Sequence, residues 1–229
     1  MKLIWIGHGS WRIESGDQVL LIDPWPSCPA LPDDRRDEAT KGGTHILATH
    51  GHFDHTNDIV EVSKALGAPV SGIFELANHL HSLGAKEGHA FNKGGSIDVG
   101  DMKITLVPAS HSSSMQVGDR GAYMGSETGC IIEAEGHTIY HSADTTIMAD
   151  MAWIADYHKP DIGILSAGGY YTMDMRAAAY AAKRYFNFKT VLPSHYRTFP
   201  ALEQSVDVLR DGLPGVTVLD PDVLQAVDI

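Results

Sequence analysis

The chain has 229 residues, of which 43% are hydrophobic, and carries a formal net charge of −12. This length suits one large α/β domain, and the acidic balance disfavours binding to the phosphate backbone of nucleic acids. Cys28 and Cys130 are too few for a disulfide framework or a thiolate-rich zinc site. The apolar stretch at residues 1–6 is too short for a signal peptide or a membrane span, so we expect a cytoplasmic protein without a membrane partner.

The first half of the chain predicts an antiparallel start followed by strands and helices. Three short strands separated by glycine-containing turns are expected at residues 2–6, 10–14 and 18–22. Residues 24–43 are rich in Pro, Asp and Arg, have no periodicity, and predict a long surface loop. Residues 44–49 predict a short buried strand. Helices are expected over 57–66 and 74–83, each followed by a glycine.

The second half predicts further strands alternating with helices. The expected elements are hairpins at 97–99 with 102–107 and at 130–134 with 138–141, helices at 146–157 and 173–186, strands at 161–166 and 191–192, and a last helix and strand near 216–219. This order predicts an α/β fold in a single domain, residues 1–229.

Four residues with metal-binding side chains stand just beyond predicted strands. They are His50, His111, Asp144 and His195. Loops at strand ends are held by a rigid sheet and are where α/β proteins place reactive groups. We therefore expect these four loops to converge.

The segment that follows the strand at 44–49 is the strongest functional signal. It places His50, His52, Asp54 and His55 within six residues, in the pattern His-x-His-x-Asp-His. Imidazole nitrogen and carboxylate oxygen are ligands for zinc, iron and manganese. A chance histidine cluster is the alternative, but this ordered pattern, placed between a buried strand and a helix, favours parts of two adjacent metal sites.

This pattern resembles the signature of the metallo-β-lactamase superfamily. The family expects a later histidine at a strand end, then an aspartate, then a late histidine, and His111, Asp144 and His195 occur in that order. The resemblance implies an α/β fold of four layers, the αββα sandwich of the metallo-β-lactamase type. It covers nearly the whole chain.

A closer resemblance is to small bacterial and archaeal metal-dependent hydrolases similar to ascorbate-6-phosphate lactonase. The strings Ile-Gly-His-Gly-Ser at 6–10, Leu-Ile-Asp-Pro at 21–24 and Pro-Ser-His-Tyr-Arg-Thr-Phe-Pro at 193–200 carry it. Two positions depart from that group, which usually has glycine at each. Ala143 should be tolerated unless its φ is positive. Because of Asp174, the resemblance does not determine which residues form the rim of the pocket.

The resemblance implies two divalent metal ions, with zinc the first expectation and manganese, iron or nickel as alternatives. The implied ligands are His50, His52 and His111 for the first ion, Asp54, His55 and His195 for the second, and Asp144 shared by both. Two ions about 3.5–4 Å apart can hold a bridging hydroxide that attacks a carbonyl carbon or a phosphorus. Asp54 and Asp144 would offset positive charge and orient that hydroxide.

Two other polar residues, His8 and Asp23, have two interpretations each. His8 could line the pocket as a contact or an acid, or could be a turn histidine that bonds to backbone. Asp23 could accept a hydrogen bond from a ligand histidine, or could simply start an Asp-Pro turn. His45 and His141 are expected to be strand residues. Asp58 is expected to be a first-turn acid of a helix.

The predicted function is hydrolysis of a small ester, lactone or phosphate-containing metabolite. A di-iron redox protein of the same fold is one alternative, although such proteins typically have glutamate where His52 stands and work with a flavin domain. A phosphodiesterase or nuclease is another, and the acidic charge disfavours it. The expected partner is a small-molecule substrate, and self-association into a homo-oligomer stays open.

Overall fold

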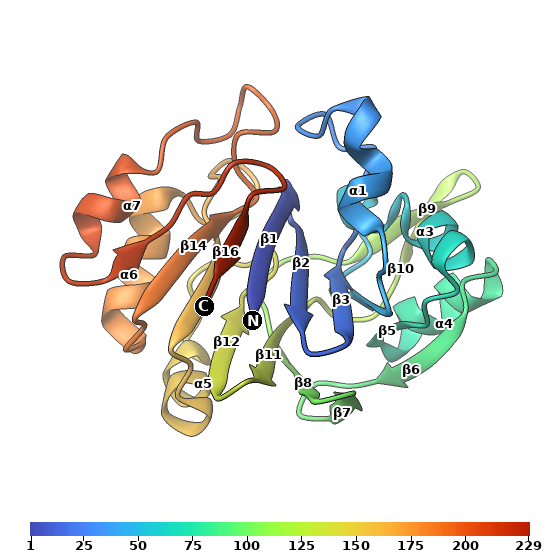
Figure 1. Cartoon of the computed structure of the whole chain (residues 1–229), viewed down its shortest axis with the longest axis horizontal. Helices are drawn as coiled ribbons and strands as arrows, with labels where there is room; N and C mark the ends of the chain where they lie inside the picture. Colours follow the sequence, from blue (N-terminus) through green and yellow to red (C-terminus); the bar gives the residue numbers. More distant parts are fainter.

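Two large β-sheets lie face to face in the computed structural model, which describes residues 1–229 (Figure 1). The first sheet has the order β16-β1-β2-β3-β4-β5-β6. Its strands are β1 (Lys2–Gly7), β2 (Ser10–Ser15), β3 (Gln18–Ile22), β4 (His45–Ala48), β5 (Val70–Ile73), β6 (Glu87–Phe91) and β16 (Ala226–Asp228). Pairing is antiparallel from β16 to β3 and parallel from β3 to β6.

The second sheet has the order β15-β14-β13-β12-β11-β8-β7. Its strands are β7 (Ser96–Val99), β8 (Met102–Pro108), β11 (Thr128–Ala134), β12 (His137–His141), β13 (Ile162–Ser166), β14 (Thr190–Ser194) and β15 (Thr217–Val218). It is antiparallel from β7 to β12 and parallel from β12 to β15. A separate two-stranded hairpin consists of β9 (Ser114–Val117) and β10 (Arg120–Tyr123).

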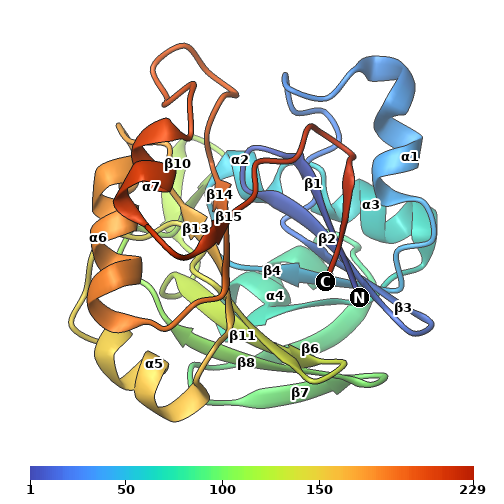
Figure 2. The same ribbon diagram turned by 60° about the vertical axis from the view of Figure 1, so that its left-hand side comes forward.

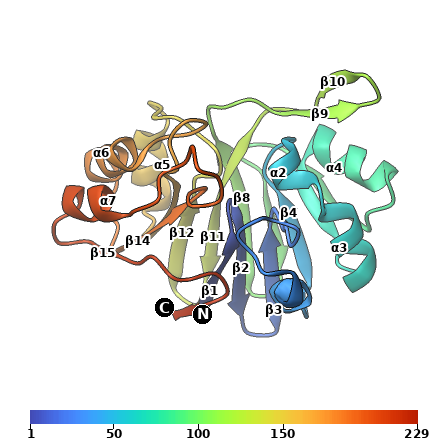
Figure 3. The same ribbon diagram turned by 90° about the horizontal axis from the view of Figure 1, so that it is seen from above.

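Helices cover the outer faces of both sheets, which gives the four layers (Figures 2 and 3). Those on the first sheet are α2 (Phe53–Thr56), α3 (Ile59–Leu66) and α4 (Phe74–Ser82), and those on the second are α5 (Met151–His158), α6 (Met175–Tyr185) and α7 (Asp207–Gly212). The sandwich expected from the resemblance is therefore confirmed. No helix combines the length and the apolar character needed to cross a lipid bilayer.

Strand alternation distributes the apolar residues between two cores. Leu20 and Ile22 of β3 belong to the larger core, together with Ile104 and Ile131 of the opposite sheet. Leu21, which lies between them in the chain, belongs to the smaller core under α3 and α4. Successive side chains of a strand point to opposite faces, so one strand can hold the sheets together and anchor the helices at once.

The expected strands occur, but several elements were missed. The loop at 24–43 contains a 3-10 turn (Asp33–Arg35) and α1 (Arg36–Thr40), and the helix expected from residue 146 begins only at Met151. The unpredicted strands are β5, β6, β9, β10 and β16. They are short, and their backbone partners are set by the tertiary fold, so local periodicity carries little signal for them.

His45 gives a pH prediction for the fold. It is buried in β4 beside Ser71, with 2.8 Å between Nε2 and Oγ, and burial together with nearby His89 lowers its pKa to about 4. In the unfolded chain the imidazole binds a proton near pH 6.5, whereas in the folded chain it stays neutral until about pH 4. The folded state is therefore most favoured above pH 6.5, and protonation of the unfolded chain destabilises it as the pH falls towards 4. The unfolding free energy of both proteins falls when the pH is lowered from 7 to 4. We expect this fall to be smaller in His45→Gln than in the parent protein, by about 2–3 kcal/mol. Urea denaturation at both pH values measures this, and equal losses would contradict it.

Candidate metal centre

Four strands deliver polar side chains to one edge of the sandwich. β4 ends at Ala48, β8 at Pro108, β12 at His141 and β14 at Ser194. The loops that follow carry, respectively, His50, His111, Asp144 and His195. The predicted convergence of these loops is confirmed, because the four side chains lie within a few ångströms of one another.

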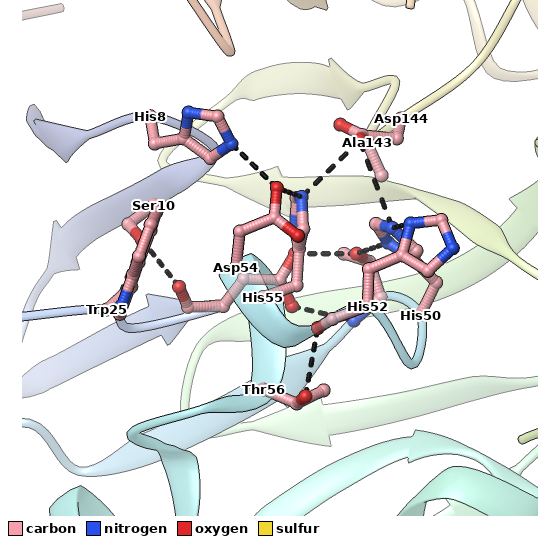
Figure 4. Close-up of polar contacts among 12 residues, drawn as sticks. His8, Ser10, Trp25, His50, His52, Asp54, His55, Thr56, Ala143 and Asp144 are labelled. Atoms are coloured by element: carbon pink, nitrogen blue, oxygen red, sulfur yellow. Dashed lines mark hydrogen bonds and ion pairs between the residues drawn. The ribbon is translucent and has the colours of Figure 1, made fainter. Parts of the chain in front are cut away.

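The His-x-His-x-Asp-His segment divides its side chains between two groups. His50 and His52 precede α2, and His52 is its N-cap, whereas Asp54 and His55 lie inside its single turn. The change from extended to helical backbone aims the two pairs in different directions. Figure 4 shows Asp54 and His55 on the side of His8, with His50 and His52 on the other.

The first group consists of His50, His52 and His111, whose ligand atoms lie within 4.8 Å of one another. Nδ1 of His52 lies 3.2 Å from Nε2 of His50 and 3.2 Å from Nε2 of His111. Three ring nitrogens that face one another at these distances favour a cation between them, because neutral imidazoles present lone pairs there. Burial lowers the pKa of His50 well below its usual range, which favours that neutral form.

The second group combines Asp54, His55 and His195 with His8. Oδ2 of Asp54 lies 3.4 Å from Nε2 of His195 and 3.8 Å from Nε2 of His55. His8 donates from Nε2 to the same oxygen at 2.7 Å.

Asp144 lies between the two groups. Its Oδ2 is 3.1 Å from Nε2 of His195, 3.4 Å from Nε2 of His55, 3.6 Å from Nε2 of His111 and 3.9 Å from Nε2 of His50. Burial opposes its ionisation, but His195 and His55 outweigh burial and hold its pKa well below the usual range. The resemblance implies that two ions share Asp144, and in the structure this carboxylate lies near imidazole nitrogens of both groups.

Unpartnered buried nitrogens show that the donor set fits a metal. Nε2 of His55 and Nε2 of His195 are buried and have no hydrogen-bond partner. Such atoms are rare in folded proteins and need a reason. Imidazole and carboxylate donors that converge without a mutual hydrogen-bond pattern are the donor set of a divalent cation.

Asp23 sets the orientation of two of these histidines. It accepts hydrogen bonds from His55 Nδ1 at 2.7 Å, from the Thr49 backbone N at 2.8 Å and from Thr49 Oγ1 at 2.5 Å. Because the Thr49 hydroxyl donates to Asp23, it accepts from His50 Nδ1 at 3.0 Å. Both histidines then carry their proton on Nδ1 and present the Nε2 lone pair to the centre.

Thr49 and Gly9 are contributors that the sequence interpretation missed. Thr49 immediately precedes the histidine motif, and its position there was the available signal. A Cβ on Gly9 would lie 2.5 Å from Cε1 of His55, so only glycine leaves room for this ring. Asp58, expected as an acid at the start of a helix, is the N-cap of α3, and its Oδ2 also accepts from the Ser27 backbone N at 2.7 Å, which ties the 24–43 loop to α3.

His8 connects the two sheets next to the site. It has a φ of 51° and is fully buried. Its carbonyl oxygen accepts from the His195 backbone N at 2.8 Å and from Trp5 Nε1 at 2.9 Å. The backbone of the turn is therefore fixed, and the His8 side chain reaches Asp54 rather than open space.

A cavity of about 880 Å³ opens onto the centre. His52, Asp54, His111, Asp144 and His195 all line it. Tyr171 lines it as well, whereas Asp174 caps α6 by accepting from the Ala177 backbone N at 2.6 Å. The departure from glycine at Asp174 is thus explained by helix capping.

Ala143 has a φ of 49°, so the condition under which alanine is poorly tolerated is met. A Cβ in the left-handed region costs about 1–2 kcal/mol, and glycine returns about 0.5–1 kcal/mol of that in unfolded-state entropy. We expect Ala143→Gly to raise the unfolding free energy by about 0.5–1 kcal/mol in urea denaturation. The equally buried Ala134 lies in β11, so Ala134→Gly should lower it. A lower unfolding free energy in Ala143→Gly would contradict the conclusion that the backbone of Ala143 is strained.

Comparison with known proteins gives consistent matches. A model described as "Beta-lactamase superfamily domain" matches residues 18–196. A UPF0173 metal-dependent hydrolase of Ruegeria pomeroyi is 56% identical over 100% of both chains. The structure of Igni18, a metallo hydrolase from the archaeon Ignicoccus hospitalis, has a TM-score of 0.82 and 30% identity, covering 100% of this chain and 98% of that one. A solved structure from Parabacteroides distasonis, at 23% identity and a TM-score of 0.69, shares the fold over 96% of this chain and 92% of that one.

Proposed function

The chain belongs to the beta-lactamase superfamily and, within it, to the UPF0173 family of metal-dependent hydrolases, and from this premise we propose that its centre holds two divalent ions. His50, His52 and His111 would bind the first, Asp54, His55 and His195 the second, and Asp144 both. The more specific resemblance to ascorbate-6-phosphate lactonase stays a prediction.

The observation that carries the proposal is the position of Asp144. One carboxylate oxygen lies 3.1–3.9 Å from four imidazole nitrogens that come from both groups. The unpartnered nitrogens of His55 and His195 favour an ion in the second group, and the facing ring nitrogens of His50, His52 and His111 favour another ion in the first group. Two ions, when bound, lower the pKa of a water molecule and polarise the bond to be cleaved, which suits hydrolysis of an ester, lactone or phosphate-containing metabolite.

The remaining residues orient this machinery. Asp23 and Thr49 hold His50 and His55 in the tautomer that presents Nε2. Asp54 and Asp144 supply negative charge that offsets the cations. His8 is buried and outside the cavity lining, so we propose that it acts by holding the Asp54 carboxylate rather than by touching substrate.

Metal content per chain tests the proposal. Elemental analysis of protein purified without a histidine tag should give close to two ions per chain, and zinc is expected before manganese, iron or nickel. Hydrolysis of model esters and lactones should disappear on chelation and return when that metal is added back. Protein that stays free of metal after incubation with zinc or manganese would refute the two-ion centre.

A further inference from the structure

The cavity beside the metal centre has an apolar wall that the proposed chemistry does not use. Its side chains are Phe53, Val60, Leu80, Leu83, Met115 and Phe199. They come from α2, α3, α4 and its C-terminal end, β9, and the loop after β14. In Figures 1 and 3, the β9–β10 hairpin lies on the same side of the molecule as α3 and α4. The wall is thus built by three helices, one strand and one loop that meet only in the tertiary structure.

The wall continues from the buried interior to the surface. Leu80 is fully buried in the core under α3 and α4, whereas Leu83 is 49% exposed and Phe53 is 65% exposed. An apolar track from a reactive centre to solvent removes water from an apolar ligand along its length.

No cationic side chain lines this cavity. Its histidine and aspartate residues are all candidate metal ligands, and its other polar residues are neutral, such as Thr56, Asn57 and Gln116. Sites for phosphate or carboxylate groups usually supply Arg or Lys for charge-assisted hydrogen bonds. The protein as a whole carries a net charge of −12, which also repels anions.

We infer that the substrate is a neutral ester or lactone with an apolar tail, rather than a metabolite that carries a phosphate or carboxylate away from the scissile bond. This inference rests on the proposed function and narrows it. Water adds its hydroxyl to the carbonyl carbon, the acyl–oxygen bond breaks, and the leaving oxygen takes the proton. The products are a carboxylic acid and an alcohol, which for a lactone are parts of one hydroxy acid.

Two p-nitrophenyl esters of equal length and similar reactivity test the charge preference. We expect the metal-loaded protein to hydrolyse p-nitrophenyl hexanoate with a kcat/KM at least about tenfold above that of the p-nitrophenyl monoester of adipic acid, which ends in a carboxylate. Among esters from acetate to octanoate, kcat/KM should rise about two- to fourfold per methylene that the wall covers.

Leu83→Lys tests whether the wall itself is responsible. Its partial exposure lets the lysine fold without a buried charge, and the substitution should shrink the preference for hexanoate over the adipate monoester. Val208→Lys on α7 is the matched control, because Val208 is 54% exposed, lies outside the cavity lining and changes the net charge equally. It should keep the parent preference. Equal shifts in both variants would overturn the assignment to the wall.

Two outcomes separate this inference from the proposed function. Hydrolysis with no dependence on chain length, or faster hydrolysis of the adipate monoester, would refute the apolar substrate and leave the hydrolase intact. Calorimetric titration with butanamide, hexanamide and octanamide measures binding without turnover. Affinity that rises with chain length supports the inference even if no ester is hydrolysed, and equal affinities refute it.

Discussion

Asp144→Ala is expected to lower hydrolytic activity by about a thousandfold or more and to reduce metal content below two ions per chain. One carboxylate oxygen of Asp144 lies near histidines of both groups, with 3.1 Å to Nε2 of His195 and 3.6 Å to Nε2 of His111. Its loss removes a ligand from each proposed ion and the negative charge between them. Elemental analysis and ester hydrolysis on the same preparation measure both effects.

The control for Asp144→Ala is Asp98→Ala. Asp98 is an exposed residue of β7, so this variant makes the same change in net charge without touching the centre. It should keep the parent metal content and activity. Full occupancy and full activity in Asp144→Ala would refute the shared ligand and with it the two-ion proposal.

Asp23→Ala is expected to weaken metal binding by about 10–100-fold and to lower the unfolding free energy of the metal-free protein by about 3 kcal/mol. Asp23 is fully buried and accepts from His55 Nδ1 and from the backbone and hydroxyl of Thr49. Without it, these donors are unpaired in the interior, and the tautomers of His50 and His55 are no longer selected. Competition with a chelator measures the affinity, and urea denaturation measures the stability.

A second carboxylate of similar geometry separates the two effects of Asp23→Ala. Asp161, in the loop before β13, accepts from the Thr138 backbone N at 2.9 Å and from His137 Nδ1 at 2.9 Å. Both partners lie at the start of β12, at the end of the strand away from the candidate metal centre. Asp161→Ala should lower stability without changing metal affinity. If both variants bind metal like the parent, Asp23 has only a structural role.

Asp54 of α2 and its hydrogen-bond partner His8 show what could be predicted from local sequence and what could not. The motif identified Asp54 as a candidate ligand from spacing alone. The hydrogen bond of 2.7 Å from His8 Nε2 to Asp54 joins residues 46 positions apart, and the sequence could offer His8 only as a pocket residue or a turn histidine. Burial decides between such roles, and burial depends on what packs over the turn.

The sequence by itself determined the fold class, the long strands and the candidate ligands. These features depend on short-range patterns, namely apolar alternation, glycine-bounded turns and the spacing of His50, His52, Asp54 and His55. Only the tertiary structure decided the short pairings of β5, β6 and β16, the positive φ of Ala143, the hydrogen bonds of Asp23, and the apolar wall formed by α2, α3, α4, β9 and the loop after β14. Each of these depends on contacts between segments distant in the chain, and such contacts are fixed when the two sheets and their helices pack together.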